Sequence, residues 1–83
     1  LNSKGDPIVV SIKQNGDLYI QERSIDALNL LPRLKAISEG NKNLRIYVRG
    51  DKHVPYGIVL DTIAKIKRSG FKKVALVAKL KES

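Results

Sequence analysis

Hydrophobic and polar residues alternate in the first part of the chain, and this pattern predicts a β-hairpin. Apolar side chains recur at every second position in Ile8–Ile12, which is the period of a half-buried strand. The pair Asn15-Gly16 gives a strong turn signal. Alternation resumes in Leu18–Ile20 and predicts the second strand of the hairpin.

The hydrophobic pattern also selects the register of this hairpin. A two-residue turn would place Ile12 opposite Tyr19 and mix the apolar and polar faces. A three-residue loop, Gln14–Gly16, places Ile12 opposite Leu18 and keeps one face apolar. We therefore predict the longer loop, with Gly16 in the left-handed conformation.

A helix is predicted after a polar connection at residues 21–24. Its apolar stripe has the spacing of one helical face and consists of Ala27, Leu30, Leu31, Leu34 and Ile37. Pro32 interferes with a long helix, because a proline beyond the first turn removes a hydrogen bond. The helix therefore begins near Asn29, or it begins near Asp26 and kinks; we expect the later start. Gly40 and Asn41 end it.

The second half of the chain predicts a β-α-β unit. The strand Leu44–Arg49 alternates apolar residues with Arg45, Tyr47 and Arg49, so one face is expected to be buried and the other cationic. Val74–Ala78 is apolar throughout, which favours a central strand that is buried on both faces.

The helix between these two strands has clear signals at both ends. Pro55 suits the first helical position and Gly70 the position just past the end. The predicted buried stripe consists of Tyr56, Val59, Ile63 and Ile66. Phe71 is expected to close over Ile66.

Together these elements predict an α+β fold. The order β-β-α-β-α-β indicates a two-layer sandwich, with both helices on one face of a four-stranded mixed sheet. The third and fourth strands are expected to be parallel and joined by a right-handed crossover. We expect a flexible entry at residues 1–6, a single domain at residues 7–79 and a polar tail at residues 80–83.

Charge is the main feature of the composition. The 83 residues carry a net charge of +8, most of it in the last part of the chain, and they include no cysteine. Such a balance favours an anionic partner. The candidate surface for that partner comprises Arg45, Arg49, Lys72, Lys73 and Lys79. No apolar run approaches the roughly 20 residues of a membrane-spanning helix, and without a methionine at position 1 we expect a domain of a longer protein.

Two function classes compete at this point. Tyr19 and Tyr47 beside the basic residues would suit a small nucleic-acid-binding module, although no RNP or KH signature is present. An enzyme is not expected, because the single histidine, His53, has no partner set for catalysis, metal or cofactor binding. Asp51 is expected to brace the turn before Pro55.

The runs RGDKHVPYG and SGFKKVALVA, with the opening PIVVSIKQNGDLYI, resemble the C-terminal domain of the ExbD/TolR family of proton-driven motor proteins. The resemblance covers most of residues 7–79. Gly50, Asp51, Tyr56 and Gly70 match the family pattern best, and we interpret them, with Pro55, as residues that shape the fold. Pro32 departs from the pattern, and because the chain stops soon after its last strand, we expect a C-terminal amphipathic helix of the TolR type to be missing or trimmed.

The resemblance implies a periplasmic domain of a single-pass inner-membrane protein, whose transmembrane helix carries the proton-handling aspartate. It implies a homodimer, a stator membrane protein of the ExbB or TolQ type, a trans-envelope partner of the TonB or TolA type, and peptidoglycan. An open edge of the first or last strand could accept a partner strand. The pattern suits both branches of the family, and we expect the TolR branch.

Overall fold

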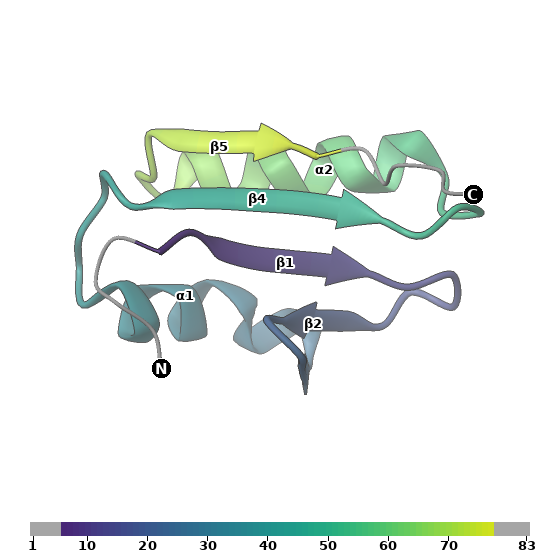
Figure 1. Ribbon diagram of the computed structural model, residues 1–83, viewed down its shortest axis with the longest axis horizontal. Coiled ribbons are helices and arrows are strands. Elements are labelled where there is room, and N and C mark those ends of the chain that lie inside the picture. The colour runs from purple at the N-terminus through teal and green to yellow at the C-terminus, as the bar shows by residue number, and fades with distance from the viewer. Residues whose placement is uncertain (1–5, 78–83) are drawn as a thin grey trace.

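The structure, a computed structural model, describes residues 6–77 and contains five strands and two α-helices (Figure 1). The elements in chain order are β1 (Ile8–Ile12), β2 (Leu18–Ile20), β3 (Arg23–Ile25), a 3₁₀ turn (Ala27–Asn29), α1 (Leu30–Ser38), β4 (Arg45–Gly50), α2 (Tyr56–Arg68) and β5 (Lys73–Leu76). The expected tail at residues 80–83 and all but the last residue of the expected entry lie outside the described residues.

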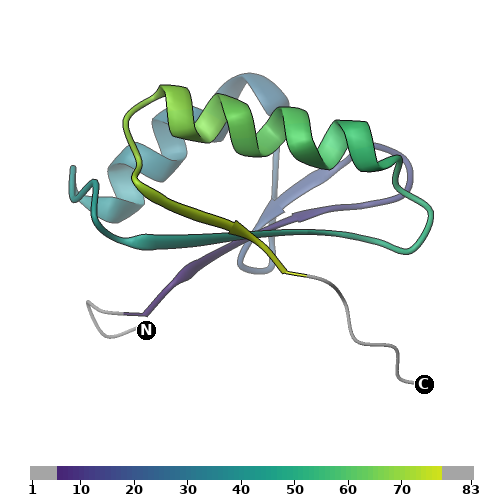
Figure 2. The same cartoon turned by 90° about the horizontal axis from the view of Figure 1, so that it is seen from above.

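The strands form one mixed sheet in the order β3-β2-β1-β4-β5. β1 pairs with β4 and β4 with β5 in parallel, whereas β1–β2 and β2–β3 are antiparallel. Both helices lie against the same face of the sheet (Figure 2). The predicted α+β class is confirmed, and so is the parallel pairing of the strands around α2. The predicted four-stranded sheet is wrong.

The additional strand is β3, in a segment where the sequence predicted only a polar connection. Gln21 begins the β2–β3 turn with a φ of 57°, a conformation in which glycine is the usual residue. Its side chain stabilises the turn, because Gln21 Oε1 accepts a hydrogen bond of 2.7 Å from the Val9 N–H. The Gln21 N–H in turn donates to the Val9 carbonyl at 2.8 Å. The turn contains none of the residues that commonly indicate a hairpin, so the sequence pattern did not predict it.

The core follows from strict alternation in the central strands. In the parallel β1–β4 pair Val10 lies opposite Val48, and both are fully buried beneath the helices. In the hairpin Ile12 lies opposite Leu18, and Gly16 has a φ of 95°. The predicted hairpin register and the left-handed Gly16 are therefore confirmed.

The start of α1 shows how the chain accommodates its proline. The 3₁₀ turn ends at Asn29 and α1 begins at Leu30, so Pro32 is its third residue. The first four N–H groups of a helix have no intrahelical acceptor, so the missing donor costs nothing there. The later of the two predicted starts is correct. The helix ends at Ser38, and Glu39 and Gly40 follow with left-handed φ values of 55° and 79°.

Three predictions around α2 and β5 need correction. Pro55 caps α2 instead of occupying its first turn, because the helix begins at Tyr56. Tyr56 is not in the buried stripe: it is 63% exposed, since it lies on the flank of α2 beyond the last strand. β5 lies at the edge of the sheet, not at its centre, and Leu76 is 41% exposed. Ala78, the predicted end of this strand, lies outside the described residues.

Gly50 lies where the end of β4 passes under α2. A Cβ atom at this position would be 2.9 Å from Val59 Cγ2 and 3.4 Å from Val54 Cβ. Val59 is buried and β-branched, so its side chain has little freedom to move away. The close approach of β4 and α2 therefore requires a residue without a side chain.

We predict that Gly50→Ala destabilises the domain by about 1–3 kcal/mol, because the added methyl overpacks this contact. Gly57 is the matched control, since a Cβ there would meet nothing within 4 Å and the position is helical. Gly57→Ala should be neutral or stabilising by about 0.5 kcal/mol. Chemical denaturation of both variants measures the difference; equal stabilities would contradict the packing argument.

Lys42, in the loop before β4, makes several contacts with the end of α2 and the residues that follow it. Its Nζ donates to the Ser69 carbonyl at 3.0 Å and lies 4.6 Å from the centroid of the Phe71 ring. Its own carbonyl accepts a 3.1 Å bond from the Lys72 N–H. A cation is favoured here because carbonyls at the end of a helix carry partial negative charge.

Replacing Lys42 with methionine keeps the aliphatic stem and removes the charge. We expect a loss of about 1–2 kcal/mol in the free energy of unfolding, from the helix-end bond and the cation–π contact. Lys65→Met is the control, because Lys65 is exposed at the same helix end without a side-chain partner among the described residues. Thermal melts that show the same loss for both variants would assign the effect to net charge alone.

Candidate functional site

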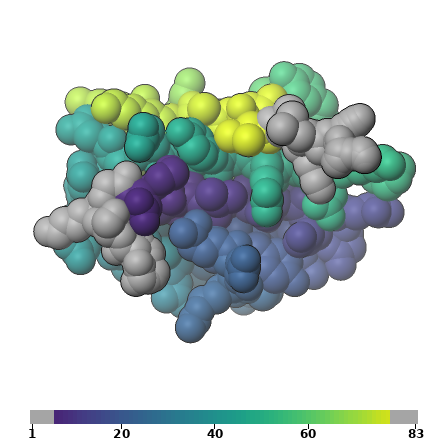
Figure 3. Space-filling view, in the orientation of Figure 1, coloured from purple at the N-terminus to yellow at the C-terminus, as the bar shows by residue number. Residues whose placement is uncertain are grey.

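The face of the sheet opposite the helices is free of covering elements within residues 6–77, and we call it the open face (Figure 3). Strand alternation places on it Val9, Ser11, Tyr19, Arg45, Tyr47, Arg49, Lys73 and Ala75. The predicted division of β4 into a buried and a cationic face is confirmed, because Ile46 and Val48 are fully buried while Arg45 and Arg49 are exposed.

The register brings only part of the predicted basic surface together. Arg45 lies directly opposite Lys73 at the start of β4 and β5, and Lys72 precedes this pair. Arg49 lies near the other end of β4, where its Nε donates to Ser11 Oγ at 3.1 Å. Lys79 lies outside the described residues. The predicted surface is therefore two separate sites on one face.

The two tyrosines share the open face but are differently placed. Tyr19 lies opposite Ser11, with Lys13 Nζ 5.3 Å from its ring centroid. Tyr47 lies between Val9 and Ala75 in the cross-strand rows. Both tyrosines are half-buried.

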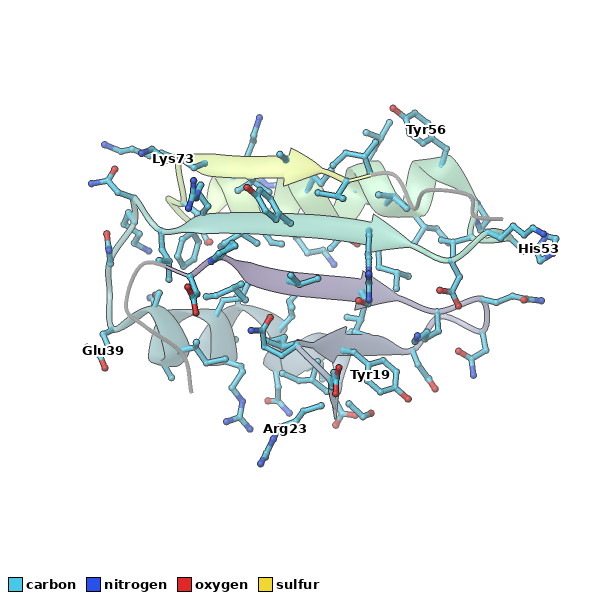
Figure 4. The ribbon with its side chains drawn as sticks, in the orientation of Figure 1. Tyr19, Arg23, Glu39, His53, Tyr56 and Lys73 are labelled. Carbon is cyan, nitrogen blue, oxygen red and sulfur yellow. The ribbon has the colours of Figure 1, made fainter. Side chains whose placement is uncertain are left out.

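A groove that the sequence did not predict runs along the β2–β3 hairpin. It has a volume of about 790 Å³ and an apolar floor that includes Val9 and Ile25. Three arginines from different elements are among its lining residues: Arg23 of β3, Arg33 of α1 and Arg49 of β4. Arg23 points away from the sheet at the β3 edge (Figure 4). This groove could not be predicted from the sequence, because β3, which forms one of its sides, was not predicted.

The two edges of the sheet differ in how accessible their backbone is. β3 is three residues long and carries exposed Arg23, two features that protect an edge from pairing. β5 has no neighbour on its outer side among the described strands. Beside it lie Tyr56, labelled beyond β5 in Figure 4, and Leu60 one helical turn later, 63% and 43% exposed. The β5 edge is therefore flanked by apolar side chains.

The residues interpreted as fold-shaping cluster at the ends of α2. The Asp51 N–H extends the sheet ladder to the Ile12 carbonyl at 2.9 Å, and the Asp51 carbonyl accepts from the Val54 N–H at 3.0 Å. Asp51 thus connects the end of β1 to the turn before Pro55. At the other end of α2, Gly70 has a φ of 113°.

Groups that could hold a metal ion are absent from residues 6–77, where no three His, Cys, Asp or Glu side chains converge. His53 is exposed in the loop before α2. Across the same residues, neither helix has the length and hydrophobicity needed to cross a membrane.

Comparison with known proteins finds similarity to biopolymer transport proteins. A family model described as biopolymer transport protein ExbD/TolR matches residues 2–81. Biopolymer transport protein ExbD of Pseudomonas aeruginosa is 32% identical over 72 residues, which cover 87% of this chain and 54% of that protein. The ExbD of Escherichia coli is 27% identical over 71 residues, covering 86% of this chain and 50% of that protein.

The relatives also indicate which branch of the family the chain resembles and how much of their length it spans. ExbD of Neisseria gonorrhoeae is 29% identical over 79 residues, 92% of this chain and 55% of that protein. The chain therefore spans about half the length of these relatives. All three carry the ExbD name, so they give the expected TolR branch no support. Since the family model covers nearly every residue, the chain belongs to the ExbD/TolR family of biopolymer transport proteins.

Proposed function

We propose that this chain is the periplasmic coupling and anchoring domain of a proton-motive-force-driven envelope motor of the ExbD/TolR type. The family match over residues 2–81 carries the proposal. The transmembrane helix and its proton-handling aspartate would belong to the part of the relatives that this chain does not span. What these residues contribute is binding: to a second copy, to a trans-envelope protein of the TonB or TolA type, and to peptidoglycan.

The β5 edge supports binding of a partner strand. The Val77 N–H donates to the Val48 carbonyl at 2.9 Å, so odd-numbered residues of β5 face β4. Val74 and Leu76 direct their N–H and C=O groups to the outer edge, because these groups alternate sides along a strand. A strand added there would gain backbone hydrogen bonds and apolar contact with Leu60 and Tyr56.

We predict that Leu76→Pro abolishes binding of a TonB-like or TolA-like peptide, because it removes an outward N–H while leaving the bonds to β4 in place. Leu76→Ala is the matched control: it removes the same side chain and keeps the N–H. Calorimetric titration should show at most a few-fold weakening for the alanine variant. Equal affinities for the two variants would exclude pairing at this edge. Sedimentation of the unmodified chain tests the homodimer in the same samples.

Peptidoglycan is the proposed anchoring ligand, and the Arg45–Lys73 pair supports it. Two cations directly opposite each other on neighbouring strands repel, and an acidic polymer would relieve that repulsion. The three arginines of the hairpin groove offer a second place for carboxylates, which guanidinium groups bind with two parallel hydrogen bonds.

Cosedimentation with purified peptidoglycan tests this part. We expect the chain to pellet with peptidoglycan at low salt and to be released as salt screens the contact. The double variant Arg45→Gln, Lys73→Gln should pellet several-fold less, whereas Lys13→Gln, Lys52→Gln, with the same net charge, should not change. A chain that stays monomeric and ignores both peptidoglycan and trans-envelope peptides would refute the proposed function.

A further inference from the structure

Parallel pairing places the ends of several helices and strands together at one end of the molecule. β1, β4 and β5 all run in the same direction, so their first residues lie together. α1 and α2 each precede one of these strands through a short connection, so the helices also end there. Figure 1 shows this arrangement at the left, where α1 passes into β4 and α2 into β5.

Basic side chains concentrate at this end, which we call the basic end. They are half of the chain's 16 Lys and Arg residues: Lys35, Lys42, Arg45, Lys65, Lys67, Arg68, Lys72 and Lys73. The acidic residues there are Glu39 and Asp6, so eight positive charges face two negative ones. Lys73 and Glu39 mark the basic end in Figure 4, and His53 marks the opposite end.

Helix stability explains only part of this concentration. Lys35 lies in the last turn of α1, and Lys65, Lys67 and Arg68 lie in the last turn of α2, where cations are favoured. Arg45, Lys72 and Lys73 lie outside the helices. The like charges of Arg45 and Lys73 lie opposite each other, an arrangement that destabilises the sheet without a counterion.

The charges of the basic end are available to a partner. Lys42 is engaged with Ser69 and Phe71, as described above. The other seven are exposed, and none uses its side chain in a hydrogen bond or ion pair within residues 6–77. No acidic side chain within residues 6–77 therefore competes with an external anionic surface for them.

We propose that the basic end docks on the anionic phospholipid surface of a membrane. The cations come from two helix ends and two strand starts, so they cover a blunt end of the molecule, which matches an extended surface of phosphate headgroups. Most of them are lysines, whose flexible ammonium groups contact phosphate as point charges. Phe71 is 2% exposed, and Tyr47, two residues after Arg45 in β4, is half-buried, so neither ring is fully available for a nucleic-acid base to stack on.

The route of the chain agrees with this orientation. β1 begins at the basic end, so any segment before residue 6 joins the domain on that side. This step rests on the proposed function, in which the preceding segment is a membrane helix. Lipid binding by the basic end itself rests only on the charges and can be tested with the 83-residue chain.

Vesicle binding of the 83-residue chain is the direct test. We expect the chain to cosediment with vesicles of phosphatidylcholine mixed with phosphatidylglycerol, to ignore pure phosphatidylcholine, and to be released by salt. Each Lys or Arg near an anionic surface strengthens binding about fivefold, so Lys65→Gln, Lys67→Gln, Arg68→Gln should weaken it about 100-fold. Lys13→Gln, Arg23→Gln, Lys52→Gln removes the same charge elsewhere and should weaken it far less.

Two further experiments test vesicle binding without changing residues of α2. One uses a second charge variant, and the other uses two dye-labelled variants. Lys35→Gln, Lys72→Gln should weaken vesicle binding about 30-fold by the same reasoning. The chain lacks cysteine, so an environment-sensitive dye can be placed at Asn43→Cys, before β4, or at Gln14→Cys, after β1. Anionic vesicles should change the emission of the dye at position 43 and leave that at position 14 unchanged.

Three results would overturn the proposal. The first is equal loss of vesicle binding in the two triple variants, which would reduce the effect to net charge. The second is a response of the dye at position 14 that equals the response at position 43. The third is binding of a single-stranded oligonucleotide or of peptidoglycan, but not of anionic vesicles, through the basic end. Failure of vesicle binding together with intact binding of trans-envelope peptides would leave the proposed motor function standing.

Discussion

The parallel pairing of β1 with β4 is the constraint on which the rest of this fold depends. The two strands are separated in sequence by the whole of β2, β3 and α1, yet they pair along five residues at the centre of the sheet. Their inward side chains, among them Val10, Ile46 and Val48, are fully buried. This pairing fixes the direction of β4, and the crossover through α2 then fixes β5 beside it. The face covered by the helices, the open face and the two unlike ends of the molecule all follow from it.

Features encoded by neighbouring residues could be predicted from the sequence. The alternation in β1 and β2 fixed the hairpin register, since a shift by one residue would have turned Leu18 out of the core. Glycines at the end of α2 and in the β1–β2 loop identified the left-handed positions, because few other residues adopt them without strain. Pro32 located the start of α1 by the same kind of local reasoning.

Features that depend on distant partners could not be predicted in this way. β3 exists because Gln21 adopts a left-handed conformation and binds Val9 with its side-chain amide, and no turn residue indicates it. The apolar run of β5 predicted a central strand, which is wrong, because the composition of a strand does not specify whether another strand pairs with its outer side. Tyr56 has the correct helical spacing for the core, but it lies on the flank of α2 that β5 leaves uncovered. The arginine groove was missed because it requires β3.

The same topology that builds the core also places the proposed binding surfaces next to each other. β5 begins at Lys73 in the basic end and runs away from it, along the exposed edge that would receive a partner strand. A strand paired with β5 would therefore extend from the basic end of the domain toward its far end. The proposed contact with phospholipids consists of many weak charge interactions that salt screens. The proposed pairing with a partner strand consists of directional hydrogen bonds. The two proposed contacts use different parts of β5, its first residue and its outer edge, and they rest on different physical forces, so one would not block the other.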